Sequence, residues 1–441
     1  MKRAGMRRLE RVSRPPDPPA PTRGRFSRMR GALADTRPLR TPAFRRLWFA
    51  GIVTVVGAQL SVVAVPFQVF GITGSSAYVG LTGLFGLVPL IVFGLWGGAI
   101  ADAMDRRTVL LISATGIALS SLALWVLAAT GSGNVWLVLS TYAVQQAFLA
   151  VNQPTRGAIL PRILPYDQLP AANALNMMVF MFGAIVGPLL AGVLLPVIGL
   201  STLYLVDAIA LTATLWATWR LPTMPPTPLE PGQAPRRAGL RDVIAGFVFV
   251  ARQKILLVSF LVDIVAMGFG MPRAVFPEAA VRTFGDSPDG GPALGWLYAA
   301  IAIGSFVGGL FSGWLHRVTR QGVAITISIC VWGLGVALFG IAGSLWLAVV
   351  FLAVAGAADL VSAVYRSTML QVVATDEMRG RMQGVFIVVV AGGPRLADIW
   401  HGPVAAGAGT AFAATFGGVA VIVLTVVVVA WLPQFWRYRA S

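Results

Sequence analysis

Residues 410–433 read TAFAATFGGVAVIVLTVVVVAWLP, a stretch that contains no charged side chain. An α-helix needs about 20 apolar residues to cross the roughly 30 Å of hydrocarbon in a bilayer. Similar segments lie at 46–70, 77–101, 108–130, 134–156, 172–196, 200–220, 255–281, 292–315, 321–343, 346–368 and 382–408. The sequence therefore predicts an all-α integral membrane protein with twelve transmembrane helices.

The composition agrees with a membrane protein and excludes several other classes. Of the 441 residues, 57% are hydrophobic and 12% are charged, about half the charged fraction of an average soluble domain. Cys330 is the only cysteine, and His316 and His401 are the only histidines, which excludes a disulfide scaffold and a multi-histidine metal site. The chain has no P-loop and no nucleophile–base pair. We expect no cofactor and no enzymatic activity.

Basic residues predict how the segments are oriented. All but three of the 34 Lys and Arg lie in the N-terminal tail, in the even-numbered loops, at the C-terminus or at the adjoining helix ends. The exceptions are Arg273, Arg282 and Arg395. Basic residues stay on the cytoplasmic side during insertion, so both termini are expected in the cytoplasm of a bacterial plasma-membrane protein.

The chain divides into two tails, two bundles and a linker. We expect a disordered basic cytoplasmic tail at 1–43, six-helix bundles at 44–220 and 254–434, a linker at 221–253 and a short tail at 435–441. Residues 1–40 hold twelve Lys and Arg among prolines. Such a tail suits anionic lipid headgroups better than nucleic acid. The expected partners are membrane lipids, with no nucleic acid.

Glycines recur between the two halves at an offset of 215 positions. Gly80 falls on Gly295, and Gly187-Pro188 falls on Gly402-Pro403. Two parallel six-helix repeats around a cavity near the midplane are typical of transporters that rock between two states. The same repeat would also suit a passive channel.

The loop after the second segment carries a recognisable motif. Residues 97–107 read GGAIADAMDRR, and this stretch resembles the loop 2–3 signature of the major facilitator superfamily through Gly98, Asp102, Arg106 and Arg107. Ala103 and Asp105 depart from that signature. The resemblance implies two pseudo-symmetric six-helix bundles and a gating role for the loop. The alternative interpretation is an ordinary positively charged cytoplasmic loop.

A second motif lies on the fifth segment, where residues 183–192 read GAIVGPLLAG. This stretch resembles the antiporter motif of exporters in the superfamily, and its candidate residues are Gly183, Gly187, Pro188 and Gly192. Small residues let helices approach closely, and a proline kinks a helix. A plain packing face explains the pattern equally well.

Stretches of the C-terminal half are similar to the enterobactin-exporter-like branch of the superfamily. They are 266–277 and 365–371, together with 379–381 and, near the N-terminus, 41–45. The likeness covers essentially residues 40–434. It implies export of siderophore-like or drug-like small molecules, driven by protons.

Four acidic residues lie well inside predicted helices, where a charge costs roughly 2.5–3.5 kcal/mol on insertion scales. They are Asp207, Asp263, Asp359 and Asp398, and we interpret them as proton-coupling candidates together with Arg366 and Arg395. Asp263 is the first choice, because no basic residue lies within two turns of it on its own helix. Static ion pairing is the alternative, especially for Arg395 and Asp398, which are three residues apart.

Uncharged polar and aromatic residues supply candidates for the substrate cavity. The resemblance implies that helices 1, 4, 7 and 10 line that cavity. The candidates are Gln59, Gln68, Gln145, Gln146, Asn152 and Phe269. The amides could equally hold helix pairs together, and aromatic rings commonly face lipid or neighbouring helices.

The sequence as a whole predicts a monomeric secondary transporter that exports an amphiphilic small molecule in exchange for protons. An importer or facilitator of the same architecture is the second interpretation. A non-transporting membrane receptor or scaffold is the third.

Overall fold

The computed structural model describes residues 35–225, 248, 250, 251, 253–373 and 376–439; for 95–103, 372, 373 and 376–391 it describes the helical backbone alone. The N-terminal half contains α2 (Pro42–Thr73), α3 (Ser76–Ala103), α4 (Arg106–Ala129), α5 (Val135–Ile163) and α6 (Leu169–Trp219). Short 3₁₀ helices η1 (Arg37–Arg40) and η2 (Tyr166–Gln168) precede α2 and α6. Most of the basic tail and of the linker lies outside the described residues.

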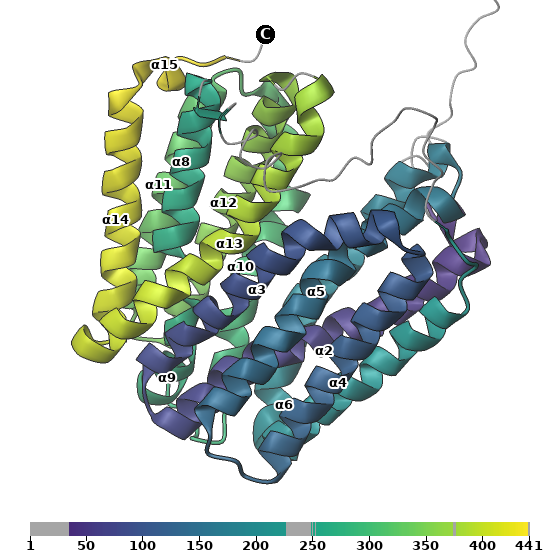
Figure 1. The fold of residues 1–441 in the computed structure, drawn as a ribbon. Helices are drawn as coiled ribbons and strands as arrows, with labels where there is room; N and C mark the ends of the chain where they lie inside the picture. Colours follow the sequence, from purple (N-terminus) through teal and green to yellow (C-terminus); the bar gives the residue numbers. More distant parts are fainter. Residues whose placement is uncertain (1–34, 226–247, 249, 252, 374–375, 440–441) are drawn as a thin grey trace, which may run out of the picture.

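The C-terminal half repeats this arrangement. It contains α8 (Lys254–Gly270), η3 (Arg273–Val275), α9 (Phe276–Arg282), α10 (Pro292–Leu310), η4 (Ser312–Arg317), α11 (Gln321–Gly340), α12 (Leu345–Val373), α13 (Asp376–Ala408), α14 (Thr410–Trp431) and α15 (Pro433–Trp436). In Figure 1 the two halves form two helical lobes that meet at one end and diverge toward the other.

The predicted number of twelve spans is confirmed. Ten stretches of the described residues are long and apolar enough to cross a membrane, and one of them, Tyr166–Trp219, contains two predicted segments. Two helices meet within that stretch at a kink at Gly199, whose φ of 77° lies in the left-handed region that glycine adopts most readily. The helix α13 supplies the remaining span.

The seventh predicted helix is interrupted, which the apolar pattern did not reveal. The helix α8 ends at Gly270, and α9 resumes the path at Phe276 after the short η3. Pro272 lacks a backbone donor and disfavours helical geometry at Met271, whose φ and ψ are −111° and 88°. The break places the half-buried Arg273 in η3, between the buried residues Pro272 and Ala274.

We call the end of the molecule where α6 ends and α8 begins the linker end, and the opposite end the far end. At the far end one hydrophobic cluster contains side chains of both halves, among them Phe67 and Leu195 with Phe276 and Leu294. The lobes meet at this end in Figure 1. The shared apolar core therefore holds the halves together at the far end.

Glycine-to-glycine packing forms the two seams between the halves. A Cβ on Gly402 of α13 would lie 2.7 Å from the Gly80 Cα on α3, and a Cβ on Gly192 of α6 would lie 2.9 Å from the Gly295 Cα on α10. Gly80 lies 215 positions before Gly295, but Gly192 lies 210 positions before Gly402. The two halves therefore repeat, but the equivalent glycines of α6 and α13 are 210 positions apart. This offset is five residues smaller than the 215 that aligned Gly187-Pro188 with Gly402-Pro403.

Candidate substrate and proton-coupling site

A charged cluster lies at the first of the two seams, where α13 packs on α3 and contacts α5. We call it the seam cluster. The Arg395 guanidinium on α13 donates a hydrogen bond of 2.7 Å to Gln146 Oε1 on α5, which joins the two halves. A Cβ on Gly86 of α3 would lie 2.8 Å from Arg395 Nε, so the glycine leaves room for this side chain. Two of our candidates, one from each half, are thus in direct contact.

The break in the seventh helix completes this seam cluster. The backbone N–H of Ala274 in η3 donates a hydrogen bond to Asp398, which also interacts electrostatically with Arg273 and Arg395. Arg273 is half-buried, and its side chain forms no hydrogen bond or ion pair with any residue that the structure describes. Tyr142 on α5 and Tyr298 on α10 lie within electrostatic range of Arg273 and Asp398.

A second charged cluster lies inside the C-terminal half. Arg366 on α12 forms an ion pair with Asp263 on α8, and its other nitrogen lies 3.7 Å from Asp359 Oδ1. The Asp263 and Arg366 side chains are 3% and 6% exposed, whereas Asp359 is 29% exposed. Two carboxylates therefore share one guanidinium, and solvent reaches only one of them readily.

The basic partner of Asp263 comes from another helix, which the sequence could not show. The seven-residue spacing of Asp359 and Arg366 predicted their proximity, but nothing along the chain indicated that α8 would approach the same guanidinium. Because Arg366 contacts Asp263 directly, Asp359 is the carboxylate with the freer access.

A third polar network lies inside the N-terminal half around Asp207 on α6. Its Oδ2 accepts hydrogen bonds from Ser61 (2.7 Å) and Ser121 (2.9 Å), and Gln145 donates to Ser121. Asp207 is 1% exposed, and no ion pair reaches it from the described residues. Gln68 accepts a hydrogen bond from the Tyr204 hydroxyl (2.8 Å) nearby. These amides tie the helices of one bundle together.

The remaining cavity candidates lie away from the seam. Gln59 packs closely against α6. A Cβ added to Gly187 of α6 would collide with the Cβ of Gln59. Phe269 packs against the Trp400 ring of α13 at 5.5 Å between centroids. Asn152 on α5 donates to Ser113 on α4 (2.9 Å).

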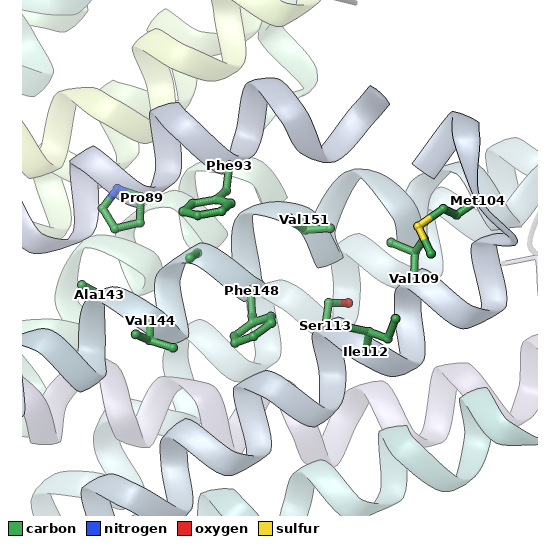
Figure 2. A pocket seen from close by; sticks show the side chains of 11 residues that line it. Pro89, Phe93, Met104, Val109, Ile112, Ser113, Ala143, Val144, Phe148 and Val151 are labelled. Carbon is green, nitrogen blue, oxygen red and sulfur yellow. The ribbon is translucent and has the colours of Figure 1, made fainter. Parts of the chain in front are cut away.

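Ser113 also borders an apolar cavity of about 530 Å³ between α3, α4 and α5 (Figure 2). The side chains of Pro89, Phe148 and Val151 line it with Ser113, and several lining residues such as Val144 are exposed on the surface of the N-terminal half. No charged side chain of the described residues lines this cavity. Its chemistry suits hydrocarbon rather than proton binding.

The basic pair of the loop motif ties the linker ends of three helices together. The Arg106 Nη1 donates to the Ala158 carbonyl of α5 (3.0 Å), and the Arg107 Nη2 donates to the Trp219 carbonyl of α6 (2.7 Å). For Gly98 and Asp102 the structure describes the helical backbone alone, so their part in the motif stays a prediction.

Asp105 departs from the superfamily signature for a local reason. Its carboxylate caps α4 by accepting from the Thr108 N–H (2.9 Å) and also accepts from the Met224 N–H (2.7 Å). Burial alone would raise the pKa of Asp105, but hydrogen bonds from the Thr108 and Met224 backbone outweigh it and hold the pKa below its ordinary value.

The small residues of the second motif serve two interfaces. A Cβ on Gly183 or Gly187 would collide with Val55 or Gln59, so these two glycines let α6 pack on α2. The Pro188 carbonyl and Gly192 instead meet Gly295 of α10 on the seam between the halves. The motif thus combines packing within a bundle with contact between the bundles.

A polar contact between the halves closes the far end beside the shared core. Glu278 on α9 accepts a hydrogen bond from Ser76 at the start of α3 and forms an ion pair with Arg282. Arg282 also donates to the Gly74 carbonyl (3.2 Å) and lies over the Phe70 ring at 5.6 Å. We call Ser76, Glu278 and Arg282 the far-end latch.

Sequence reasoning did not select Arg273, Tyr298 or the far-end latch as site residues. A signal existed, because Arg273, Arg282 and Arg395 are the three basic residues that depart from the distribution of the others. Arg282 and Arg395 contact the opposite half, and Arg273 lies within electrostatic range of Tyr142 in that half. Tyr298 carries no comparable signal in the sequence.

Comparison with known proteins decides the family. The sequence pattern of the family described as transmembrane secretion effector, within the major facilitator superfamily, matches residues 33–437. The chain belongs to this family. It is 28% identical over 406 residues to the enterobactin exporter EntS of Shigella boydii serotype 18, covering 91% of this chain and 94% of that protein. The EntS protein of Escherichia coli O1:K1 / APEC is 27% identical over the same length, with the same coverage of both chains.

Solved structures share the fold of this secretion-effector chain. A mutant of the peptide transporter POT in complex with alafosfalin superimposes with a TM-score of 0.71 at 12% identity, covering 90% of this chain and 96% of that one. The nucleoside transporter NupG superimposes with a TM-score of 0.68 at 16% identity, covering 90% of this chain and all of NupG.

The secretion-effector chain is therefore a multi-pass membrane transporter of the efflux type and not an enzyme. The predicted fold, two pseudo-symmetric six-helix bundles of the major facilitator type, is confirmed. Its location in the inner membrane follows from the exporter relatives and the apolar helices.

Proposed function

We propose that this transporter exports a small amphiphilic organic molecule across the plasma membrane by alternating access, in exchange for protons. The observation that carries the proposal is the one-sided closure: the shared apolar core and the far-end latch join the halves at one end, and the lobes diverge at the other. The names of the EntS relatives support a siderophore-like cargo.

The distribution of basic residues supports placing the linker end in the cytoplasm. In that orientation the structure is closed toward the outside, so cargo would enter from the cytoplasm. The halves 44–220 and 254–434 would then rock as two bodies, with the linker 221–253 between them. Since one chain supplies both halves, we propose that the transporter acts as a monomer surrounded by lipid.

Asp359 is our proposed proton carrier. Arg366 can pair with Asp263 alone when Asp359 is protonated, and with both when Asp359 is ionised, so the proton changes the balance of a shared guanidinium. The greater exposure of Asp359 gives protons a route to it. Asp207, by contrast, is held by hydroxyl donors inside its bundle, which supports a structural role.

Transport into inverted membrane vesicles tests this function. We expect accumulation of a labelled member of a panel of siderophores and lipophilic dyes, and collapse of that accumulation when the pH gradient is removed. Asp359→Asn should abolish the gradient-driven part, whereas Asp207→Asn, a matched change of another buried carboxylate, should retain it.

Two outcomes would contradict the proposal. Accumulation that ignores the pH gradient would reject proton exchange and favour a facilitator. Uptake only into right-side-out vesicles would identify an importer.

A further inference from the structure

Arg273 presents an unusual electrostatic situation in the seam cluster. It lies in the break between α8 and α9, it is half-buried, and its guanidinium has no hydrogen-bond or ion-pair partner among the described residues. A guanidinium that is always charged and carries five donors is costly to keep unpaired inside a membrane protein. Such a group calls for a partner of opposite charge.

Tyr298 adds a second unsatisfied donor at the same place. Its hydroxyl is buried and has no hydrogen-bond partner in the part of the chain that the structure describes. It lies within electrostatic range of Arg273, Asp398 and Tyr142. Buried hydroxyls are almost always hydrogen-bonded, so an orphaned one beside an unpaired guanidinium indicates a missing ligand.

Among the residues that the structure describes, the seam cluster has an excess of positive charge. Arg273 and Arg395 contribute two positive charges and Asp398 contributes one negative charge. Arg395 also binds Gln146 on the opposite half, so a molecule held by this cluster would touch both halves. Guanidinium groups bind carboxylates and similar oxyanions with fork-like geometry.

We propose that Arg273 and Arg395, with the Tyr298 hydroxyl, form a subsite for an anionic oxygen group, a carboxylate or ionised phenol, on the transported molecule. The inference rests on the proposed function in so far as the anion is cargo. The subsite lies on the seam, where movement of one half relative to the other would change its access.

This subsite has a consequence for the proton. A proton on Asp398 would remove the charge that competes with the anion, so proton and anion would favour each other's binding. Exchange requires the opposite coupling. The exchanged proton therefore belongs to the Asp263–Arg366–Asp359 cluster rather than to Asp398.

Equilibrium binding to the full chain in detergent tests the subsite without any gradient. The probes are 2-naphthoate and its neutral isostere 2-naphthamide, which share one ring system and differ in charge. We expect the acid to bind at least about tenfold more tightly than the amide. Arg273→Gln should weaken acid binding by about 10- to 100-fold, the effect of losing a hydrogen bond to a charged group, and leave amide binding unchanged.

Matched variants separate the subsite from a general loss of charge or of folding. Arg317→Gln removes the same charge from an exposed position and should change neither affinity. Tyr298→Phe should weaken acid binding by about two- to tenfold without lowering the melting temperature, because its hydroxyl has no partner to lose. Tyr204→Phe, which breaks the hydrogen bond to Gln68, should lower the melting temperature and leave the preference for the acid intact.

Asp398→Asn should change the affinity for the acid in the opposite direction. Removing the competing carboxylate should strengthen acid binding. Equal affinities for the two probes, no binding of either, or unchanged acid binding in Arg273→Gln and Arg273→Lys would overturn the proposal. The two proposals can fail separately. If vesicles show no proton exchange while the preference for the acid and its loss in Arg273→Gln are observed, the proposed function is wrong and the subsite is supported.

Discussion

At the scale of single residues, the buried acids of this transporter differ in their partners more than in their depth. Asp263 faces a guanidinium, Asp398 faces a backbone N–H and two arginines at longer range, and Asp207 faces two hydroxyls. A carboxylate held by neutral donors within one bundle has no charged group to exchange. Its contacts favour a structural role for Asp207.

Asp207→Asn should therefore keep export, because the amide oxygen can still accept from Ser61 and Ser121. Ser61→Ala should destabilise the protein by about 1.5–3 kcal/mol, the usual effect of losing a hydrogen bond to a charged group. Denaturant titration in detergent micelles measures the stability, and vesicle transport measures the export. A folded Asp207→Asn variant without export would return this acid to the proton pathway.

Residue-scale pH dependence is expected at Asp105, outside the membrane spans. The folded pKa of this carboxyl lies below its ordinary value, so its stabilising effect is present above the unfolded pKa and is lost as pH falls through the folded pKa. Asp105→Ala should cost about 1 kcal/mol at pH 7, as for other helix caps. The difference in melting temperature from the parent protein should shrink in strong acid.

The exposed Asp289 provides a control for this comparison, since Asp289→Ala removes a surface carboxylate whose side chain caps no helix. A stability difference for Asp105→Ala that grows toward low pH would contradict the capping interpretation.

At the scale of helices, close approach decides how the halves meet. The helix α13 packs on α3 through Gly402, where an added Cβ would collide with the Ser76 carbonyl oxygen. A backbone atom cannot move away from such a contact, whereas a flexible side chain could change its rotamer. A single methyl group therefore acts on the whole seam.

Gly402→Ala should force α13 and α3 apart and weaken closure at the far end by about 1–3 kcal/mol, the usual cost of overpacking. Gly407→Ala is a matched control on the same helix, because a Cβ there would meet nothing within 4 Å. Alkylation of a cysteine introduced by Ser76→Cys, in a Cys330→Ala background, measures how open the far end is. Equal alkylation in both variants would show that the seam does not control closure.

At the scale of the whole molecule, the two halves contact each other at the far end through the shared core and the far-end latch. The far-end latch and the shared core are the contacts that must separate if the protein is to open on that side. Alternating access therefore predicts that fixing this end stops transport without unfolding either bundle.

Ser76→Cys with Glu278→Cys, again with Cys330→Ala, allows this test with a short reagent that bridges two thiols reversibly. Export should stop on cross-linking and return when the bridge is reduced. Each single-cysteine variant treated with the same reagent is the control. Continued export by the cross-linked protein would reject rocking between the halves.

Properties set along one chain could be predicted from the sequence. Segment length, apolar content and the distribution of arginine determine the spans and their expected direction, because insertion into lipid depends on each segment and its flanks. The loop motif and the glycine repeat predicted the superfamily fold. Arg273, Arg282 and Arg395 stood out in the sequence as exceptions to the distribution of basic residues, but only the structure showed that they lie near the opposite half.

Only the tertiary structure decided which groups meet. The pairing of Asp263 with Arg366 and the contact of Arg395 with Gln146 depend on how helices distant in sequence pack together. A periodic pattern states which face of a helix is apolar but not which helix lies against it. For that reason the sequence predicted that charges would be buried, and the packing decided what each charge does.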